Sequence, residues 1–156
     1  MMASTLAIGM WAIAVSSLNV SPTDDSGRFM VSFDPGPIAI YRADGYREWD
    51  HVVPLPPGTI CEVGSFVGWD RGSLGEANLE LNISGYRLYE RSEHKESPVN
   101  YDAWVVREER REVREGESIH MHLGAVQTGP NAHDGGLSTR VHFAFRLQMN
   151  AHGVCD

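Results

Sequence analysis

The sequence has few of the residues that are typical of a cofactor site or a covalently cross-linked scaffold. Its two cysteines, Cys61 and Cys155, form neither a CxxC motif nor a zinc-binding spacing. They are able to pair, but two unpaired thiols are the simpler expectation. The chain also lacks a GxSxG nucleophile motif and a Gly-rich phosphate loop. We therefore expect no bound cofactor and no enzyme activity.

Positive charge is also scarce, with 13 Lys and Arg residues against 21 Asp and Glu and a formal net charge of −8. An acidic chain repels phosphate, which argues against a nucleic-acid partner. The apolar core within residues 4–20 is only about 12 residues long, short of the roughly 20 that a membrane helix needs. No Lys or Arg precedes it, as a signal peptide would require. We expect no membrane partner, and we expect this segment to be retained in the folded protein.

Turn-forming residues, by contrast, recur at short intervals, and the 156 residues include 16 Gly and 8 Pro. Short strands between such breaks are typical of an antiparallel sandwich or barrel. The expected fold is therefore all-β, an antiparallel β-sandwich of about eight strands that is jelly-roll-like. We expect a single domain over 1–156, with 1–20 as an apolar N-terminal strand or arm. The predicted turns lie at residues 21–24, 34–36, 43–45, 56–58, 70–72, 97–98 and 129–136.

Strict alternation of apolar and polar residues identifies the strands and their inner faces. The inner residues are expected to be Phe29, Val31 and Phe33; Leu79, Leu81 and Ile83; and Val141, Phe143, Phe145, Leu147 and Met149. Gly85 predicts a bulge after which Tyr86 and Leu88 return to the inner face. In 59–69, Val63, Val67 and Trp69 are expected on one face, and Ile60 and Phe66 on the other. Residues 107–115 fit a strand or a helix, and strand, turn, strand is favoured because a helix would lack an apolar stripe.

Two histidines, His120 and His122, stand two residues apart within a predicted strand over 118–126. The alternation places Ile119, Met121, Leu123 and Ala125 in the core, so both imidazoles point outward. His142 points outward on its own strand, and three imidazoles would meet if the two strands were neighbours. An HxH pair on a strand supplies two zinc ligands, and His133 is a further candidate. Solvated surface histidines are the alternative interpretation.

The cupin family is the specific comparison for this pattern, because a glycine (Gly116) precedes HxH in both. A cupin has a glutamate three or four residues after the second histidine, where this chain has Val126 and Gln127. It also takes a later ligand from a separate strand pair, and few residues remain for one. We therefore expect no metal site, and His120, His122 and His142 remain the candidates for a cupin-like metal enzyme.

Carbohydrate or receptor binding, as in a tail or fibre module, is the other alternative, and it would need a row of exposed aromatic rings. Most of the tryptophans and tyrosines lie at inward positions or strand ends, which favours core packing. The acidic residues do not converge in sequence either. Asp24, Asp25, Asp44, Asp50 and Asp70 are expected at turns, where short polar side chains cap backbone groups.

The N-terminal segment 6–15 is apolar on both faces of a strand. Burying six such side chains is worth on the order of 10 kcal/mol, so we expect the segment to be covered on both sides. Its cover would be the protein's own sheet or a neighbouring subunit. The residues expected at that interface are Leu6, Ile8, Trp11 and Ile13. The charged run Arg107–Arg114 is a candidate for salt links between subunits, with a solvated surface as the default.

The pattern of the chain resembles the small β-sandwich proteins of viral shells. These include single jelly-roll capsid proteins and the trimeric decoration or cement proteins of tailed-bacteriophage heads. The resemblance rests on the strand over 139–149, the pattern over 116–126 and the apolar N-terminal arm. It implies a non-catalytic structural protein of the virion that forms a homotrimer or lattice and contacts other capsid subunits.

Overall fold

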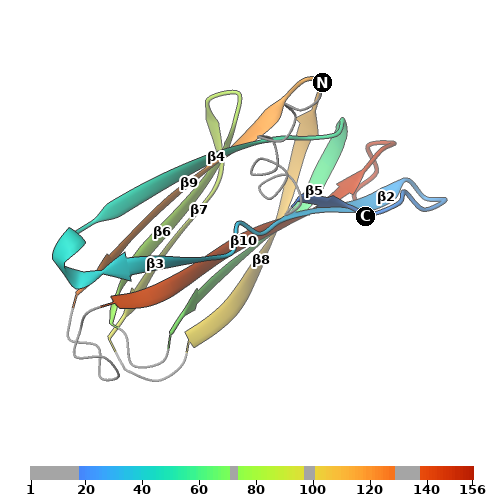
Figure 1. Ribbon diagram of the computed structural model, residues 1–156. Helices are drawn as coiled ribbons and strands as arrows, with labels where there is room; N and C mark the ends of the chain where they lie inside the picture. The colour runs from blue at the N-terminus through green and yellow to red at the C-terminus, as the bar shows by residue number, and fades with distance from the viewer. Residues whose placement is uncertain (1–17, 71–73, 97–100, 129–137) are drawn as a thin grey trace, which may run out of the picture.

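The computed structural model describes residues 18–70, 74–96, 101–128 and 138–156, and these form ten strands and one short 3-10 helix. Figure 1 shows the strands arranged in two layers. The first sheet contains β1 (Leu18–Val20), β2 (Arg28–Phe33), β3 (Pro37–Tyr41), β5 (Gly58–Trp69), β8 (Tyr101–Val113) and β10 (Ser138–Asn150). The second contains β4 (Arg47–Pro54), β6 (Gly75–Ile83), β7 (Tyr86–Lys95) and β9 (Ser118–Gln127). The helix η2 spans Arg42–Asp44 between β3 and β4.

The strand order is that of a jelly roll, and the expected all-β antiparallel sandwich is confirmed. The six-stranded sheet runs β1-β2-β10-β5-β8, and the four-stranded sheet runs β4-β9-β6-β7. Because β5 occupies one side of β10, β2 and β3 pair in succession along the other side and act as one interrupted strand. With the three-residue β1 set aside and β2 and β3 counted as one strand, eight strands remain. Except at the β6–β7 hairpin, each of their connections crosses from one sheet to the other.

The core lies between the sheets and contains the residues that the alternation predicted. Phe143, Phe145, Leu147 and Met149 of β10 are fully buried, and so are the predicted inner residues of β6 and β9, namely Leu79, Leu81, Ile83, Ile119, Met121, Leu123 and Ala125. Since β-strand side chains alternate between faces, a one-residue slip of any of these strands would move its whole apolar set into water. No helix among the described residues is long and apolar enough to span a membrane.

Two bulges modify the predicted faces. The pairing of β5 with β10 shifts between Ile60 and Glu62, so Cys61 is an extra residue in β5. The shift brings Ile60 into the core beside Val63 and Val67, which corrects the expected opposite faces. The second bulge lies at Leu88 of β7, where Leu81 pairs with Tyr89 and Asn82 pairs with Arg87.

The prediction of a bulge at Gly85 was wrong, because Ser84 and Gly85 form the two-residue turn of the β6–β7 hairpin. Their φ angles are +53° and +81°, as expected for a turn whose twist matches that of the two strands. Tyr86, expected to face inward, is instead exposed, whereas Leu88 is buried as predicted. The strand expected over 107–115 is present as β8, which continues to Val113. Glu115 and Gly116 form the turn that follows it.

An arginine is buried between β7 and β8, in addition to the apolar residues Leu88, Tyr89 and Val113 of these strands. The Arg91 side chain is only 4% exposed, and its Nη1 donates to the carbonyl oxygens of Ser65 at 2.9 Å and Ala103 at 3.2 Å. Its Nε lies 2.8 Å from a carboxylate oxygen of Glu93. A buried charge is tolerated when it is paired and hydrogen-bonded in this way.

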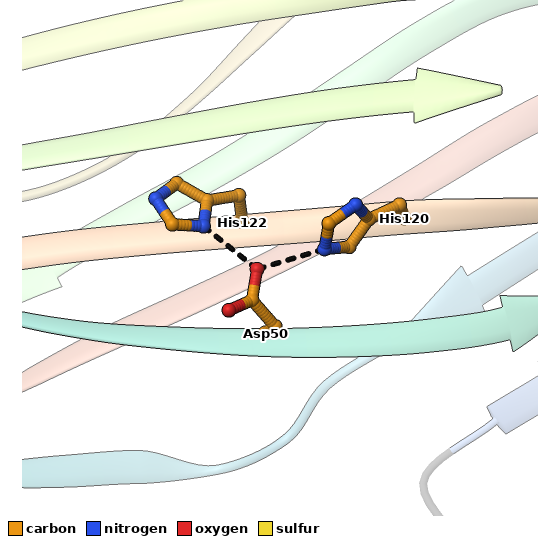
Figure 2. Close-up of side chains that lie close together, drawn as sticks. All are labelled: Asp50, His120 and His122. Carbon is orange, nitrogen blue, oxygen red and sulfur yellow. Dashed lines mark hydrogen bonds and ion pairs between the residues drawn. The ribbon is translucent and has the colours of Figure 1, made fainter. Parts of the chain in front are cut away.

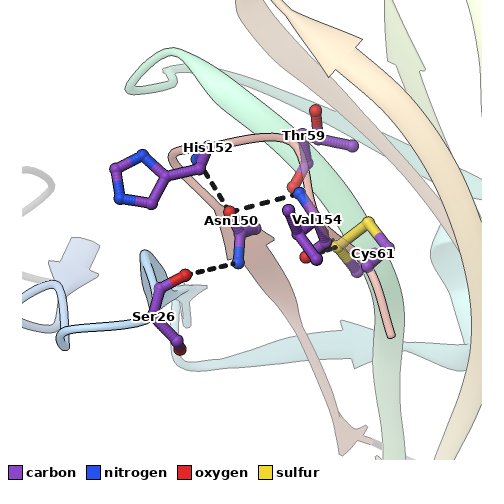
Figure 3. The surroundings of a disulfide bond; sticks show 7 residues. Ser26, Thr59, Cys61, Asn150, His152 and Val154 are labelled. Atoms are coloured by element: carbon purple, nitrogen blue, oxygen red, sulfur yellow. Dashed lines mark hydrogen bonds between the residues drawn. A yellow bond between two sulfur atoms is a disulfide. The ribbon is translucent and has the colours of Figure 1, made fainter.

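The two cysteines are joined in a disulfide, which corrects the expectation of two unpaired thiols. Their Cα atoms lie 5.3 Å apart, although 94 residues separate them in sequence. Figure 3 shows how the C-terminal residues fold back to make this possible. The buried Asn150 side chain accepts from the backbone N–H of His152 at 2.7 Å and donates to the carbonyl of Ser26 at 3.1 Å. The Cys61 bulge and the Asn150 turn therefore place the two sulfur atoms together.

We predict that Cys61→Ser lowers the free energy of unfolding by about 2–5 kcal/mol, because the disulfide closes a long loop and restricts the unfolded chain. Urea unfolding followed by circular dichroism measures this. Reductant should destabilise the wild type by a similar amount and leave a Cys61→Ser/Cys155→Ser variant unchanged. Equal stability of the oxidised and reduced wild type would contradict the prediction.

Candidate functional site

The outer face of the four-stranded sheet carries the two histidines that the sequence placed outward. His120 and His122 alternate with Ile119, Met121 and Leu123, which are fully buried. The His120 and His122 side chains are 47% and 32% exposed. Their outward direction is thus a consequence of the apolar side of β9, and the prediction is confirmed.

Asp50 of the neighbouring strand β4 joins the two imidazoles (Figure 2). The β4–β9 register places Asp50 directly opposite His122 and Val52 opposite His120. A single carboxylate oxygen, Asp50 Oδ1, lies 2.7 Å from His120 Nε2 and 2.7 Å from His122 Nδ1. The two rings are nearly perpendicular, at 75°, with centroids 6.4 Å apart. Asp50 was expected at a turn, and that prediction was wrong because the residue lies within β4.

Glu48, two residues before Asp50 on the same face of β4, contacts the other ring nitrogen of His122. Its Oε1 lies 2.8 Å from His122 Nε2. Both nitrogens of this imidazole therefore face carboxylates, an arrangement in which both donate only when the ring is protonated. We call Glu48, Asp50, His120 and His122 the histidine cluster.

The charges in the cluster shift two pKa values in opposite directions. The hydrogen bond to Asp50 raises the pKa of His122 above 6.5, outweighing the desolvation that lowers it. In turn, the hydrogen bonds from His122 and His120 lower the pKa of Asp50 below 3.8. Each partner therefore favours the charged form of the other.

β6, which pairs with β9 on the side opposite to β4, adds polar residues to this outer face. Glu80 lies opposite His122 and Asn82 opposite His120 in the β6–β9 register. Arg87 holds Glu80 through Nη2 at 2.8 Å and Glu90 through Nη1 at 2.7 Å. Glu80 is thus ion-paired with Arg87 of β7, and the carboxylates that contact the imidazoles, those of Glu48 and Asp50, come from β4.

The Tyr46 side chain packs against Gly124 of β9, two residues after His122. The hydroxyl and ring of Tyr46 occupy the space that a Cβ of Gly124 would take, so Tyr46 lies across β9 at that point. Any larger residue at position 124 would displace the ring. The absence of a side chain at Gly124, the register partner of Glu48, therefore leaves room for Tyr46 over β9.

The other histidines named from the sequence lie apart from this cluster. The approach of His142 to His120 and His122 was conditional on β9 and β10 being neighbours, and the two strands belong to different sheets. His142 instead pairs with Asp34, with Nε2 2.7 Å from Oδ1, and packs edge-on against Phe66. His133 lies outside the described residues. Within the described part of the chain, Asp50, His120 and His122 are the group whose ligand atoms all lie within 4.8 Å of one another, as a metal ion would require.

The aromatic residues are divided between core and surface. Trp69 is buried, as expected from its inward position. Tyr89 is also buried, although the predicted alternation with Leu88 placed it outward, and Trp49 packs partly against the core. Tyr41, Tyr46, Tyr86 and Trp104 are exposed, but they lie on or beside β3, β4, β7 and β8. These four positions do not form one row along a single strand.

The comparisons with known proteins place the chain in no family. No family model matches it, and no curated protein matches it. Among solved structures it is similar to a chain of the T13 IBDV viral particle, at 7% identity and TM-score 0.44 over 81% of this chain and 32% of that one. It is also similar to TmCBM61 in complex with β-1,4-galactotriose, at 17% identity and TM-score 0.35, covering 86% of this chain and 83% of that one.

A third similar structure is the insecticidal δ-endotoxin Cry8Ea1 of Bacillus thuringiensis. It has 9% identity and TM-score 0.42, over 73% of this chain and 20% of that one. The chain thus spans about a third of the viral chain and a fifth of the toxin. At such low identities and scores these similarities carry no argument about function.

We predict that the His122 ring titrates with a midpoint above pH 6.5 in chelator-treated protein. Asp50→Asn should lower this midpoint, because the carboxylate stabilises the imidazolium.

The same shifts make the free energy of unfolding depend on pH. The raised pKa of His122 contributes stability that is fully present below pH 6.5 and is lost as pH rises through the folded-state pKa. The lowered pKa of Asp50 adds stability that is present above pH 3.8 and lost as pH falls. The pair therefore stabilises the fold most between pH 3.8 and 6.5.

Proton NMR of the imidazole Cε1–H resonances over pH 4–9 measures the midpoint, with His122→Ala assigning the signal. A wild-type His122 midpoint at or below 6.5 would contradict the prediction.

Proposed function

We propose that the protein is a structural subunit of a virion, either a capsid protein or a head decoration (cement) protein, that stabilises a shell through subunit contacts without catalysis. The observation that carries the proposal is an exposed apolar run on the edge strand β8. Trp104, Val105 and Val106 are 42%, 39% and 49% exposed there. Large exposed apolar groups at a sheet edge are typical of association surfaces.

The local contacts show how this surface is built. β8 pairs with β5 on one side, and in the described part of the chain its other side has no partner strand. Trp104 packs against Phe66 at 5.4 Å between ring centroids. The Arg146 guanidinium lies 4.4 Å above the Trp104 ring. Trp104, Val106 and Phe66 share the outer face of the six-stranded sheet, and we call these three residues the Trp104 patch.

The second half of β8 differs from the first in that charged residues replace the apolar ones from Arg107 to Glu112. Charged residues limit uncontrolled pairing of an open edge. Arg107 and Arg111 are held within the subunit, over the Tyr89 ring at 4.9 Å and on the Ile83 carbonyl at 2.9 Å. The proposed contact therefore uses the apolar half of the strand, and Glu108 and Arg110 are the candidates for salt links to a neighbour.

The opposite edge of the same sheet supports an assembly role for the N-terminal arm. β1 forms that edge, pairing with β2 from Leu18 to Val20. The proposed interface residues Leu6, Ile8, Trp11 and Ile13 lie outside the described residues, and their contacts stay a prediction. Both edges of the six-stranded sheet would then take part in assembly.

The disulfide and the charge support the proposed location. Disulfides persist in oxidising settings, which include secreted proteins and virion surfaces. A net charge of −8 suits an outer position better than contact with packaged genome.

We predict a stable trimer or larger assembly at micromolar concentration, because a contact of this kind buries roughly 2,000 Å² or more. Val106→Asp, which places a charge in the Trp104 patch, should shift the protein toward monomer. Light scattering coupled to size-exclusion chromatography measures the mass.

Tyr86→Ser is the matched control, since Tyr86 is also exposed but lies on the four-stranded sheet. It should leave the mass unchanged. A wild type that remains monomeric at these concentrations would overturn the proposal.

A further inference from the structure

Three potential metal ligands from two neighbouring strands converge on one point of the outer face of the four-stranded sheet. They are Asp50 Oδ1, His120 Nε2 and His122 Nδ1, which lie within 4.8 Å of one another. We propose that these three atoms bind a divalent transition-metal ion of the zinc class, with water completing the coordination. This site goes beyond the proposed shell function and does not depend on it.

The ligand types fit such an ion. Imidazole nitrogen suits Zn²⁺, Cu²⁺ and Ni²⁺, whereas sites for Mg²⁺ and Ca²⁺ are built from oxygen ligands. Three protein ligands with a fourth, open position are a common zinc arrangement. Two imidazoles and one carboxylate therefore favour a zinc-class ion over a hard cation.

The distances also fit after a small adjustment. Zinc binds nitrogen and carboxylate oxygen at about 2.0–2.2 Å, so ligand atoms in a tetrahedral site are about 3.4 Å apart. The two contacts to Asp50 Oδ1 are 2.7 Å each, and would have to open by roughly 0.7 Å to admit the ion. The three side chains are 32–54% exposed, so rotation of the rings and the carboxylate is unhindered by the core.

The backbone holds the ligands in place before an ion binds. The HxH spacing puts both imidazoles on one face of β9, and the β4–β9 register fixes Asp50 opposite His122. Both strands are anchored from below, by the fully buried Ile119, Met121 and Leu123 in β9 and by the buried Val53 in β4. A site on paired strands is more precise than one on a loop.

Glu48 is a positioning residue for His122. Its Oε1 lies 2.8 Å from Nε2, the nitrogen that faces away from Asp50. A carboxylate on the far nitrogen of a ligating histidine fixes the tautomer with Nδ1 free for the metal, and its loss typically costs 10–100-fold in affinity.

Two other histidines provide matched controls. His142 pairs with Asp34 at the same 2.7 Å, and His94 lies 3.4 Å from Glu76 and 3.5 Å from Glu96. Each combines exposed imidazole with carboxylate but has one imidazole only. Ordinary surface ion pairing would make all of these sites equivalent, whereas a metal site requires both His120 and His122.

Isothermal titration of the purified full chain with Zn²⁺ tests the proposal. One ion per chain is expected, with affinity lowered at least about 100-fold by His120→Ala or His122→Ala and 10–100-fold by Glu48→Gln. His142→Ala and His94→Ala should keep the wild-type affinity. Zn²⁺ should also raise the thermal unfolding midpoint of the wild type and not that of His122→Ala, since an ion that binds only the folded state stabilises it.

Circular dichroism of each variant establishes that it folds, so that lost binding reports on the site. The proposal is overturned if the wild type takes up no stoichiometric Zn²⁺, or if His142→Ala weakens binding as much as His120→Ala.

Discussion

The burial of one face of each sheet against the other is the constraint on which the rest of this structure depends. Four long strands, β5, β6, β9 and β10, supply most of the fully buried side chains. Because neighbouring residues of a strand point to opposite faces, fixing the inner set also fixes which residues face outward. In β9, Met121 points into the core, so its neighbours His120 and His122 point to the surface. The chemistry of the outer faces is therefore organised by the core.

The alternation made the inner faces predictable from the sequence, and it failed where the backbone departs from regular pairing. Phe29, Val31 and Phe33 are buried as expected, as are the inner residues of β6, β9 and β10. Ile60 was assigned to the wrong face because the extra residue Cys61 reverses the alternation within β5. Tyr86 was misplaced because Gly85 turns the chain rather than bulging it. A period-two pattern gives no information about either event, since both depend on how many residues each partner strand contributes.

The histidine cluster and the disulfide were beyond sequence reasoning for a different reason, which is register. Asp50 contacts His120 and His122 across about 70 positions of sequence, and only the β4–β9 pairing brings them together. The HxH spacing identified the two outward histidines but gave no sign of Asp50. Likewise, Cys61 and Cys155 are 94 residues apart, and their contact depends on the Asn150 turn. A hint for Asp50 did exist, because Glu48 and Asp50 alternate with Trp49 as outward residues do.

The sandwich separates its two candidate surfaces, and this separation makes each of them testable alone. The histidine cluster lies on the outer face of the four-stranded sheet, while Trp104 and Val106 lie on the outer side of the six-stranded sheet, beside Phe66 and Gly64 in the register. Exposed ion pairs contribute only about 0–1 kcal/mol to stability, so changes within the cluster leave the core intact. A subunit contact made through the edge strand β8 would likewise leave His120 and His122 facing solvent. The cluster could then bind an ion in the free subunit and in the assembled shell alike.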